Sequence, residues 1–143
     1  MRVEDVLRVK GSAVAHVDAA APVREVVRLL RDRNLGAVVV SPDGRRIVGI
    51  LSERDVLRQL ADGTDFLDGP VAQVMTTDVR CCAPDDTVDA LMAVMTDLRV
   101  RHLPVVDRHE HLCGLVSIGD LVKARISQLQ FERDQLDNYL HQS

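Results

Sequence analysis

Aromatic residues are scarce in this sequence: its 143 residues include two phenylalanines, one tyrosine and no tryptophan. The hydrophobic core must therefore be aliphatic, built from valine, leucine, isoleucine and alanine. The chain has the usual length of one compact domain, which buries enough apolar surface to fold without disulfides or metals. We expect one domain.

Excess positive charge and long apolar runs are also missing. Eighteen Lys and Arg stand against 22 Asp and Glu, which gives a formal net charge of −4. We therefore expect no general attraction to nucleic acid or to an anionic membrane. No apolar stretch approaches the roughly 18 residues of a membrane span, and the amino terminus lacks the apolar run of a signal peptide. The sequence predicts a cytoplasmic protein in which any anionic ligand is bound by a local basic cluster.

Cysteines are few and are not spaced as in a zinc site. Cys81, Cys82 and Cys113 form no CxxC pairs, and no metal-binding signature is visible elsewhere. We interpret the three residues as buried free thiols, because cysteine often behaves as a small core hydrophobe. An intermolecular disulfide is the alternative.

What the sequence does contain is an internal repeat. Residues 49–55 (GILSERD) match residues 114–120 (GLVSIGD), an offset of 65 residues. The same offset aligns the apolar positions of the two halves without a gap. About half of the chain therefore repeats the other half.

Each copy is predicted to contain a short strand, a helix, a hairpin of two strands and a second helix. In the first copy the strands are 14–17, 37–40 and 47–51, with helices beginning at Val23 and after Ser52. In the second copy the strands are 79–82, 103–106 and 112–116, with helices beginning at Val88 and after Ser117. One unit of about 60 residues buries too little surface to be stable alone, so we expect pseudo-twofold packing in a mixed α/β fold.

The repeat divides the chain into four parts. We predict a first repeat with its lead-in helix at residues 1–63, a linker at 64–70, a second repeat with its own lead-in helix at 71–127, and a helical extension at 128–143. The apolar residues of the extended last helix are spaced for docking on a second module, although Arg133 interrupts them. We expect a homodimer. These apolar residues are Val122, Ile126, Leu129, Leu136 and Leu140.

The duplicated Gly-x-x-Ser-x-x-Asp motif lies where a strand passes into a helix. Exposed amides and the hydroxyl of Ser52 or Ser117 can receive phosphate oxygens, and the carboxylate of Asp55 or Asp120 can accept hydrogen bonds from ribose hydroxyls. The alternative is structural, with the serines as helix N-caps and the aspartates complementing the helix dipole. Duplication copies capping residues as faithfully as ligands.

These motifs resemble the cystathionine-β-synthase (CBS) domain family, whose tandem pairs are called Bateman modules. In the second copy the resemblance rests on residues 101–107 (RHLPVVD) and 114–120, and in the first on 36–40 (GAVVV) and 49–55. It covers nearly the whole chain. It implies two CBS repeats of β-α-β-β-α order with a ligand cleft between them.

The resemblance also implies roles for individual residues. Asp55 and Asp120 would bind ribose, and Ser52 and Ser117 would approach phosphate, next to Gly119. Arg101, His102 and Arg54 would be the cationic partners of the phosphate. Adenine would lie against the backbone near His16, Val17, Cys81 and Cys82, with Leu35, Val100, Gly36 and Ala37 close by. The two copies differ because Gly36 and Ala37 align with Arg101 and His102, so we expect the two clefts to differ in anion affinity.

We therefore interpret the chain as a stand-alone regulatory module that binds an adenosine-containing ligand and passes the change to an unidentified partner protein. The candidate ligands are AMP, ATP, NAD and S-adenosylmethionine, and no cofactor is required. The alternative is a scaffold without a ligand, in which the repeats serve only association. An enzyme is the least favoured interpretation, because no catalytic triad, Walker loop or frame of paired acid–base carboxylates is visible.

Overall fold

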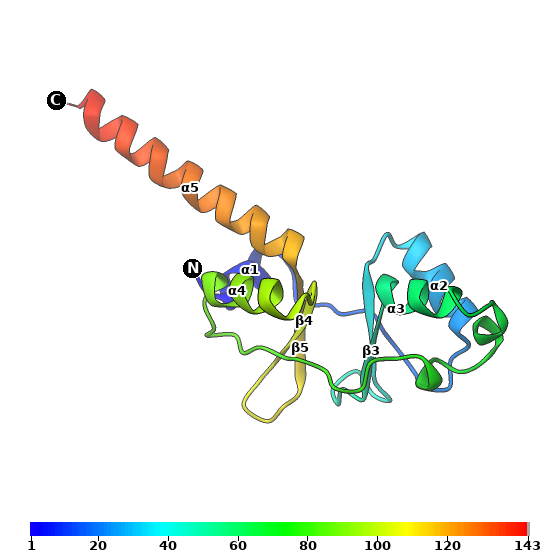
Figure 1. Cartoon of the computed structure of the whole chain (residues 1–143). Helices are drawn as coiled ribbons and strands as arrows, with labels where there is room; N and C mark the ends of the chain where they lie inside the picture. The colour runs from blue at the N-terminus through cyan, green and yellow to red at the C-terminus, as the bar shows by residue number, and fades with distance from the viewer. Residues whose placement is uncertain (143) are drawn as a thin grey trace.

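The two halves of the sequence form two lobes that lie side by side, with a long helix projecting from the second (Figure 1). The computed structural model describes residues 1–142, so Ser143 of the predicted extension lies outside the described residues. The first lobe contains β1 (His16–Val17), α2 (Val23–Asp32), β2 (Ala37–Val40), β3 (Gly49–Ser52) and α3 (Glu53–Leu60). The second contains α4 (Val88–Leu98), β4 (His102–Val106), β5 (Leu112–Ser117) and α5 (Ile118–His141). The remaining elements are α1 (Val3–Lys10) and the 3-10 helices η1 (Asp65–Asp68) and η2 (Val71–Gln73).

Both predicted hairpins are confirmed. β2 pairs antiparallel with β3, β4 pairs antiparallel with β5, and β1 adds to the first sheet parallel to β2. The strand predicted at residues 79–82 is wrong: only Cys82 makes a bridge, parallel to Val105. Its N–H donates to Pro104 and its carbonyl accepts from Val106, both at 2.9 Å, whereas residues 79–81 make no ladder with β4.

The first helix of each lobe buries the apolar stripe that the sequence predicts. Val23, Val26 and Leu30 of α2 are buried in the first core, at the three- and four-residue spacing that places side chains on one helix face. Val88, Leu91 and Met95 of α4 are the equivalents in the second core.

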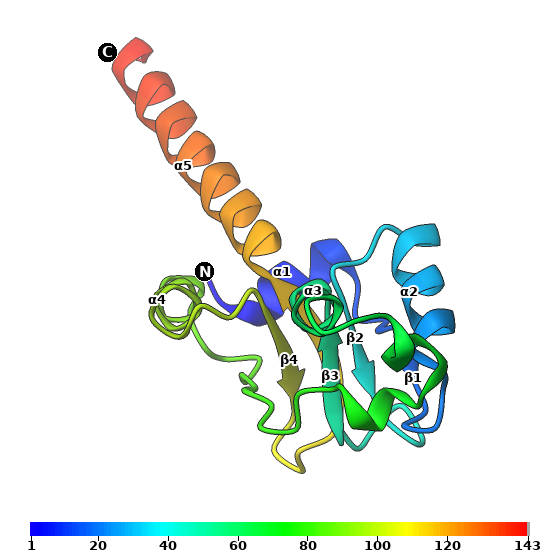
Figure 2. The same cartoon turned by 45° about the vertical axis from the view of Figure 1, so that its right-hand side comes forward.

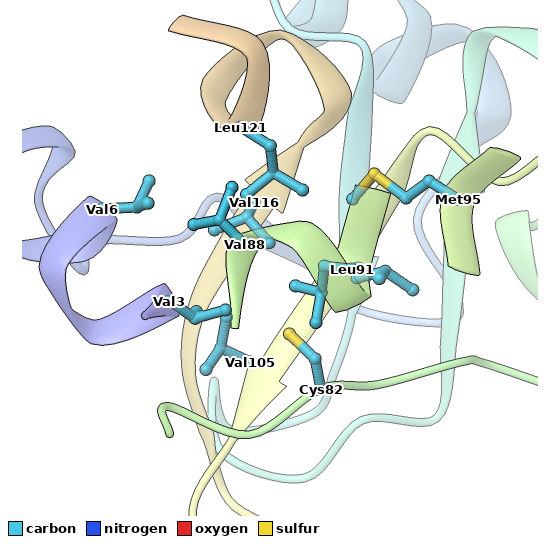
Figure 3. Packing of buried hydrophobic residues seen from close by; sticks show 10 residues of the cluster. Val3, Val6, Cys82, Val88, Leu91, Met95, Val105, Val116 and Leu121 are labelled. Carbon is cyan, nitrogen blue, oxygen red and sulfur yellow. The ribbon is translucent and has the colours of Figure 1, made fainter. Parts of the chain in front are cut away.

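The two lead-in segments are exchanged between the lobes. Val3 and Val6 of α1 are buried in the core of the second lobe, and Figure 3 shows both pointing toward its valines. Val71 of η2 is buried in the core of the first lobe, where its N–H donates to the carbonyl of Ala21 at 2.8 Å. Each repeat is therefore completed by a segment that precedes the other repeat in the sequence.

Two equivalent glycines, one in β5 and one in β3, allow these segments to pack closely on the strands. A Cβ at Gly114 would lie 2.7 Å from Cδ1 of Leu7 in α1, and a Cβ at Gly49 would overlap Sδ of Met75, just after η2. Real Cβ atoms essentially never approach other atoms so closely, so a side chain at either glycine would force Leu7 or Met75 to shift. The glycine that opens each duplicated motif thus has a packing role.

The last helix extends well beyond both lobes (Figure 2). Leu121 is buried in the second core, but the later apolar residues of α5 are exposed. They include Ile126, Leu129, Leu136 and Leu140, as well as Phe131 and Tyr139. Within residues 1–142, no helix is long and apolar enough to cross a lipid bilayer.

Candidate ligand cleft between the repeats

A cleft of about 600 Å³ lies between the two lobes and is lined by residues of both. From the first repeat it takes Gly36, the end of β3 and the first turns of α3, and from the second the segment between α4 and β4 and the start of α5. Thr76 and residues 78–80 supply part of the wall. The predicted site residues that line it are Ser52, Arg54, Asp55, Gly36, Val100, Arg101, His102, Ser117 and Gly119.

Asp55 is the buried acceptor of this cleft, with a relative exposure of 9%. Its Oδ2 accepts hydrogen bonds from the backbone N–H of Ser52 at 2.9 Å and from the Ser52 hydroxyl at 3.1 Å. Its Oδ1 accepts from the hydroxyl of Thr76 at 3.1 Å and lies 3.9 Å from a guanidinium nitrogen of Arg58. Ser52 also caps α3, because its Oγ accepts from the N–H of Asp55. Capping therefore accounts for Oδ2, whereas Oδ1 faces the neutral hydroxyl of Thr76 and, at longer range, the exposed guanidinium group of Arg58.

Asp120, the duplicated residue, does not line this cleft and has a different partner. Its Oδ2 accepts from the N–H of Ser117 at 2.9 Å and from the ammonium group of Lys10 at 2.6 Å. Burial alone raises the pKa of Asp120, but the hydrogen bonds from Lys10 and Ser117 outweigh it, so the pKa lies below its ordinary value. Lys10 was not predicted, because it lies 110 residues from Asp120 in the sequence.

Arginines gather around the cleft and outnumber its acids. Five of them line it against three acidic residues, so the lining carries a surplus of positive charge. Arg54 also joins the lobes, because its Nη1 donates to the carbonyl of Arg99 at 2.9 Å. Of the five, the sequence predicted only Arg54 and Arg101. The arginines are Arg54, Arg58, Arg80, Arg99 and Arg101, and the acids are Glu53, Asp55 and Asp78.

His102 lies at the boundary between the repeats. Burial lowers its pKa, as do the charges of Lys10 and Arg101, against the opposing effect of Glu53 and Asp120. The imidazole is therefore neutral at pH 7 and can serve as a hydrogen-bonding group rather than as the cation expected from the resemblance.

The remaining predicted residues lie outside the lining of this cleft. Val17 and Leu35 pack against the first core, and Ala37 is buried. His16 packs over Gly44 in the turn between β2 and β3. Cys81 and Cys82 follow Val79 and Arg80, which do line the cleft.

The three cysteines are free in the structure. Cys82 is buried in the second core, and burial together with the charges of Asp86, Cys81 and Cys113 raises the pKa of its thiol to about 12. Such a thiol stays protonated and unreactive at neutral pH. Cys81 is exposed and Cys113 is half-buried, so the prediction of buried thiols is confirmed for Cys82 and is wrong for Cys81. Within residues 1–142, no three His, Cys, Asp or Glu side chains gather as a metal site.

The arrangement of two similar repeats around a shared cleft defines the class of protein, a tandem-repeat module. The sequence pattern of the CBS domain family matches the chain twice, at residues 3–62 and 71–127. The chain belongs to the CBS domain family. The predicted recognition, and with it the mixed α/β fold with a carboxy-terminal helix, is confirmed.

Solved structures of the family are closely similar. A CBS-domain-containing protein of Agrobacterium tumefaciens is 38% identical, with 87% of this chain and 99% of that one covered and a TM-score of 0.83. A CBS domain protein of Pyrobaculum aerophilum, solved in complex with AMP, is 29% identical, with 84% and 89% covered and a TM-score of 0.75.

Some curated relatives are longer than this chain. A 17.7 kDa protein of Acidianus ambivalens is 35% identical over 102 residues, which are 71% of this chain and 61% of that protein. The chain spans about three-fifths of the length of this relative.

Proposed function

We propose that the module binds a phosphate-bearing adenine nucleotide in the cleft at Asp55 and acts by binding alone. One observation carries the proposal. The carboxylate of Asp55, from the first repeat, faces the same cleft as the guanidinium group of Arg101, from the second. A carboxylate can accept the two vicinal hydroxyls of ribose, and guanidinium groups bind phosphate through charge-assisted hydrogen bonds.

The relative from Pyrobaculum aerophilum, which was solved with AMP, supports an adenine nucleotide as the ligand. The charge of the cleft supports a phosphate group on it. S-adenosylmethionine carries a positive sulfonium where a nucleotide carries phosphate, so the surplus of arginine disfavours it. We therefore expect ATP and AMP to bind more tightly than NAD, and S-adenosylmethionine to bind most weakly.

Binding would regulate through the relative arrangement of the repeats. Both lobes contribute to the cleft, and the Arg54 to Arg99 hydrogen bond crosses between them. A ligand that contacts both walls shifts the equilibrium between two arrangements of the lobes only by the difference in its affinity for them. The regulated partner protein would bind one arrangement of the lobes more tightly than the other. We keep the cytoplasm as the proposed compartment.

Isothermal titration with ATP, AMP, NAD and S-adenosylmethionine tests the proposal. We expect ATP or AMP to bind, with affinity that falls as salt is added, because exposed charges are screened. If none of the four ligands binds the folded protein, the nucleotide proposal is wrong and the scaffold interpretation replaces it.

The exposed face of α5 supports self-association as a second property. Leu129 is 48% exposed and Leu136 is 58% exposed on a helix that leaves its own lobe. We propose that this face packs on a second copy. Light scattering should show a dimer, and Leu136→Glu should give a monomer, whereas Gln135→Glu next to it should leave the dimer intact. A monomeric unsubstituted protein would contradict the proposal.

A further inference from the structure

The two duplicated aspartates face groups of opposite character. Asp120 is contacted by the ammonium group of Lys10, whereas Asp55 is contacted by the hydroxyl of Thr76. Residues 71–75 (VAQVM) parallel residues 3–7 (VEDVL) at an offset of 68, and at this offset Lys10 aligns with Asp78. Asp78 lines the cleft at Asp55, and its side chain is 89% exposed. The repeat thus places a hydrogen-bonded ammonium group against Asp120, whereas the equivalent residue near Asp55 is an exposed acid whose carboxylate lies 3.8 Å from a guanidinium nitrogen of Arg80.

Lys10 is held firmly at this position. Its Nζ donates to Asp120 and also to the backbone carbonyl of Leu115, each at 2.6 Å. The helix that carries it is anchored at its other end, where Val3 is fully buried and its N–H donates to the carbonyl of Asp86 at 2.9 Å. Leu7, one turn before Lys10, packs on Gly114. The ammonium group is therefore a fixed part of the second lobe.

A ribose at Asp120 would have to displace this ammonium group. Oδ2 of Asp120 already accepts from Lys10 and from the N–H of Ser117. Exchanging a charge-assisted hydrogen bond for one from a neutral hydroxyl is unfavourable, and it would leave the Lys10 charge without its partner. At Asp55 the competition is weaker. The hydroxyl of Thr76 is a neutral donor that a ribose hydroxyl can replace, and the cation nearby, Arg58, is exposed and lies 3.9 Å away.

We infer that Lys10 acts as an internal ligand that occupies the sugar position at Asp120, so that the module binds one nucleotide and binds it at Asp55. The inference rests on the proposed nucleotide site and adds its stoichiometry and the residue that sets it. Lys10 is thus a specificity-determining residue that makes two duplicated half-sites unequal.

Titration of the full chain with ATP tests the inference. We expect one ATP per chain for the unsubstituted protein and two for Lys10→Met. In Asp55→Asn we expect the one site to weaken by about 10- to 150-fold, and in the double variant Lys10→Met/Asp55→Asn we expect one unweakened site, now at Asp120. The chain has one other lysine, Lys123, which is exposed on α5. Lys123→Met is therefore the matched control and should keep one site.

The outcomes distinguish a failure of the inference from a failure of the proposed nucleotide function. Two sites in the unsubstituted protein, or one site in a folded Lys10→Met, overturn the inference and leave the nucleotide function standing. Loss of a site in Lys10→Met also overturns it, because Lys10 would then bind the ligand. No binding to the unsubstituted protein but one site in Lys10→Met removes the function at Asp55 and overturns the one-site inference, although it shows that Lys10 excludes the ligand from Asp120. No binding to either overturns both.

A folding defect is distinguished by a conservative variant. Lys10→Arg keeps the positive charge and should keep one site, with an unfolding temperature close to that of the unsubstituted chain. If Lys10→Arg and Lys10→Met both bind two nucleotides, the charge at this position does not exclude the ligand, and the inference is wrong.

Discussion

The imidazole of His102 lies directly against Gly36, so that a Cβ at Gly36 would stand 2.8 Å from the ring atoms Cε1 and Nε2. Gly36 aligns with Arg101 and Ala37 with His102 at the repeat offset, so the ring of one repeat fills a space that the other leaves empty. The contact joins the two lobes at the wall of the cleft.

Gly36→Ala should destabilise the fold by about 1–3 kcal/mol, as expected for overpacking at a tight contact. Gly119→Ala in the same cleft is the control, because its Cβ would meet only Oγ of Ser117, at an ordinary 3.6 Å. Chemical unfolding of the two variants measures the difference. Equal stability would mean that His102 can move away at no cost.

Asp55→Asn should weaken ATP binding by about 1.5–3 kcal/mol, the usual worth of a hydrogen bond to a charged group. Asp120→Asn changes the equivalent residue of the equivalent capping box, so it controls for damage to the helix start. Calorimetric titration should show a loss of affinity for Asp55→Asn alone. Equal losses for both would show that the helix caps matter and the ribose contact does not.

Arg101→Ala should reduce the affinity for AMP by about 1.5–3 kcal/mol and leave the affinity for adenosine nearly unchanged. The reason is that only AMP carries the phosphate that a guanidinium group can bind. Arg108→Ala, in the exposed turn between β4 and β5, is the control. If AMP and adenosine lose affinity equally in a folded Arg101→Ala, Arg101 does not contact phosphate.

The stability of the protein should fall as the pH drops below 6.5, through His102. Burial lowers the pKa of His102 below its ordinary value of 6.5. The unfolded state has the ordinary pKa and the folded state the lowered one. At a pH between the two, the unfolded state binds a proton that the folded state does not, so the free energy of unfolding decreases by at most about 1.4 kcal/mol for each unit that the pH falls.

His102→Gln should remove this part of the slope, measured by urea unfolding between pH 7 and pH 5 at about half-unit steps. The lowered pKa of Asp120 acts in a separate window, because its stabilisation is lost only as the pH falls below about 3.8 toward the folded value. An identical slope in His102→Gln and the unsubstituted chain would contradict the prediction.

The repeat and its helix faces could be predicted from the sequence because they are local patterns. The spacing of Val23, Val26 and Leu30 alone specifies which face is buried, and the matching motif ends specify where α3 and α5 begin. The strand at residues 79–82 failed because a parallel ladder depends on distant partners, which an alternating pattern does not reveal.

The electrostatics of the site could be predicted only in part. Arg101 and His102 stand out because the other copy has Gly36 and Ala37 there. Arg58, Arg80 and Arg99 belong to three separate segments, and nothing in their own neighbourhoods indicates that they converge. The contact between Lys10 and Asp120 could not be predicted for the same reason, because it depends on the exchange of the lead-in segments between the lobes.

That exchange determines the order in which the chain can fold as it is synthesised. Helix α1 leaves the ribosome before either repeat, yet Val3 and Val6 pack against Val105, Val116 and Leu121, which are translated about a hundred residues later. Nascent α1 must therefore wait, with its apolar face uncovered, until most of the protein has emerged. A chain that ended at the linker would keep this helix and never acquire the surface that buries it.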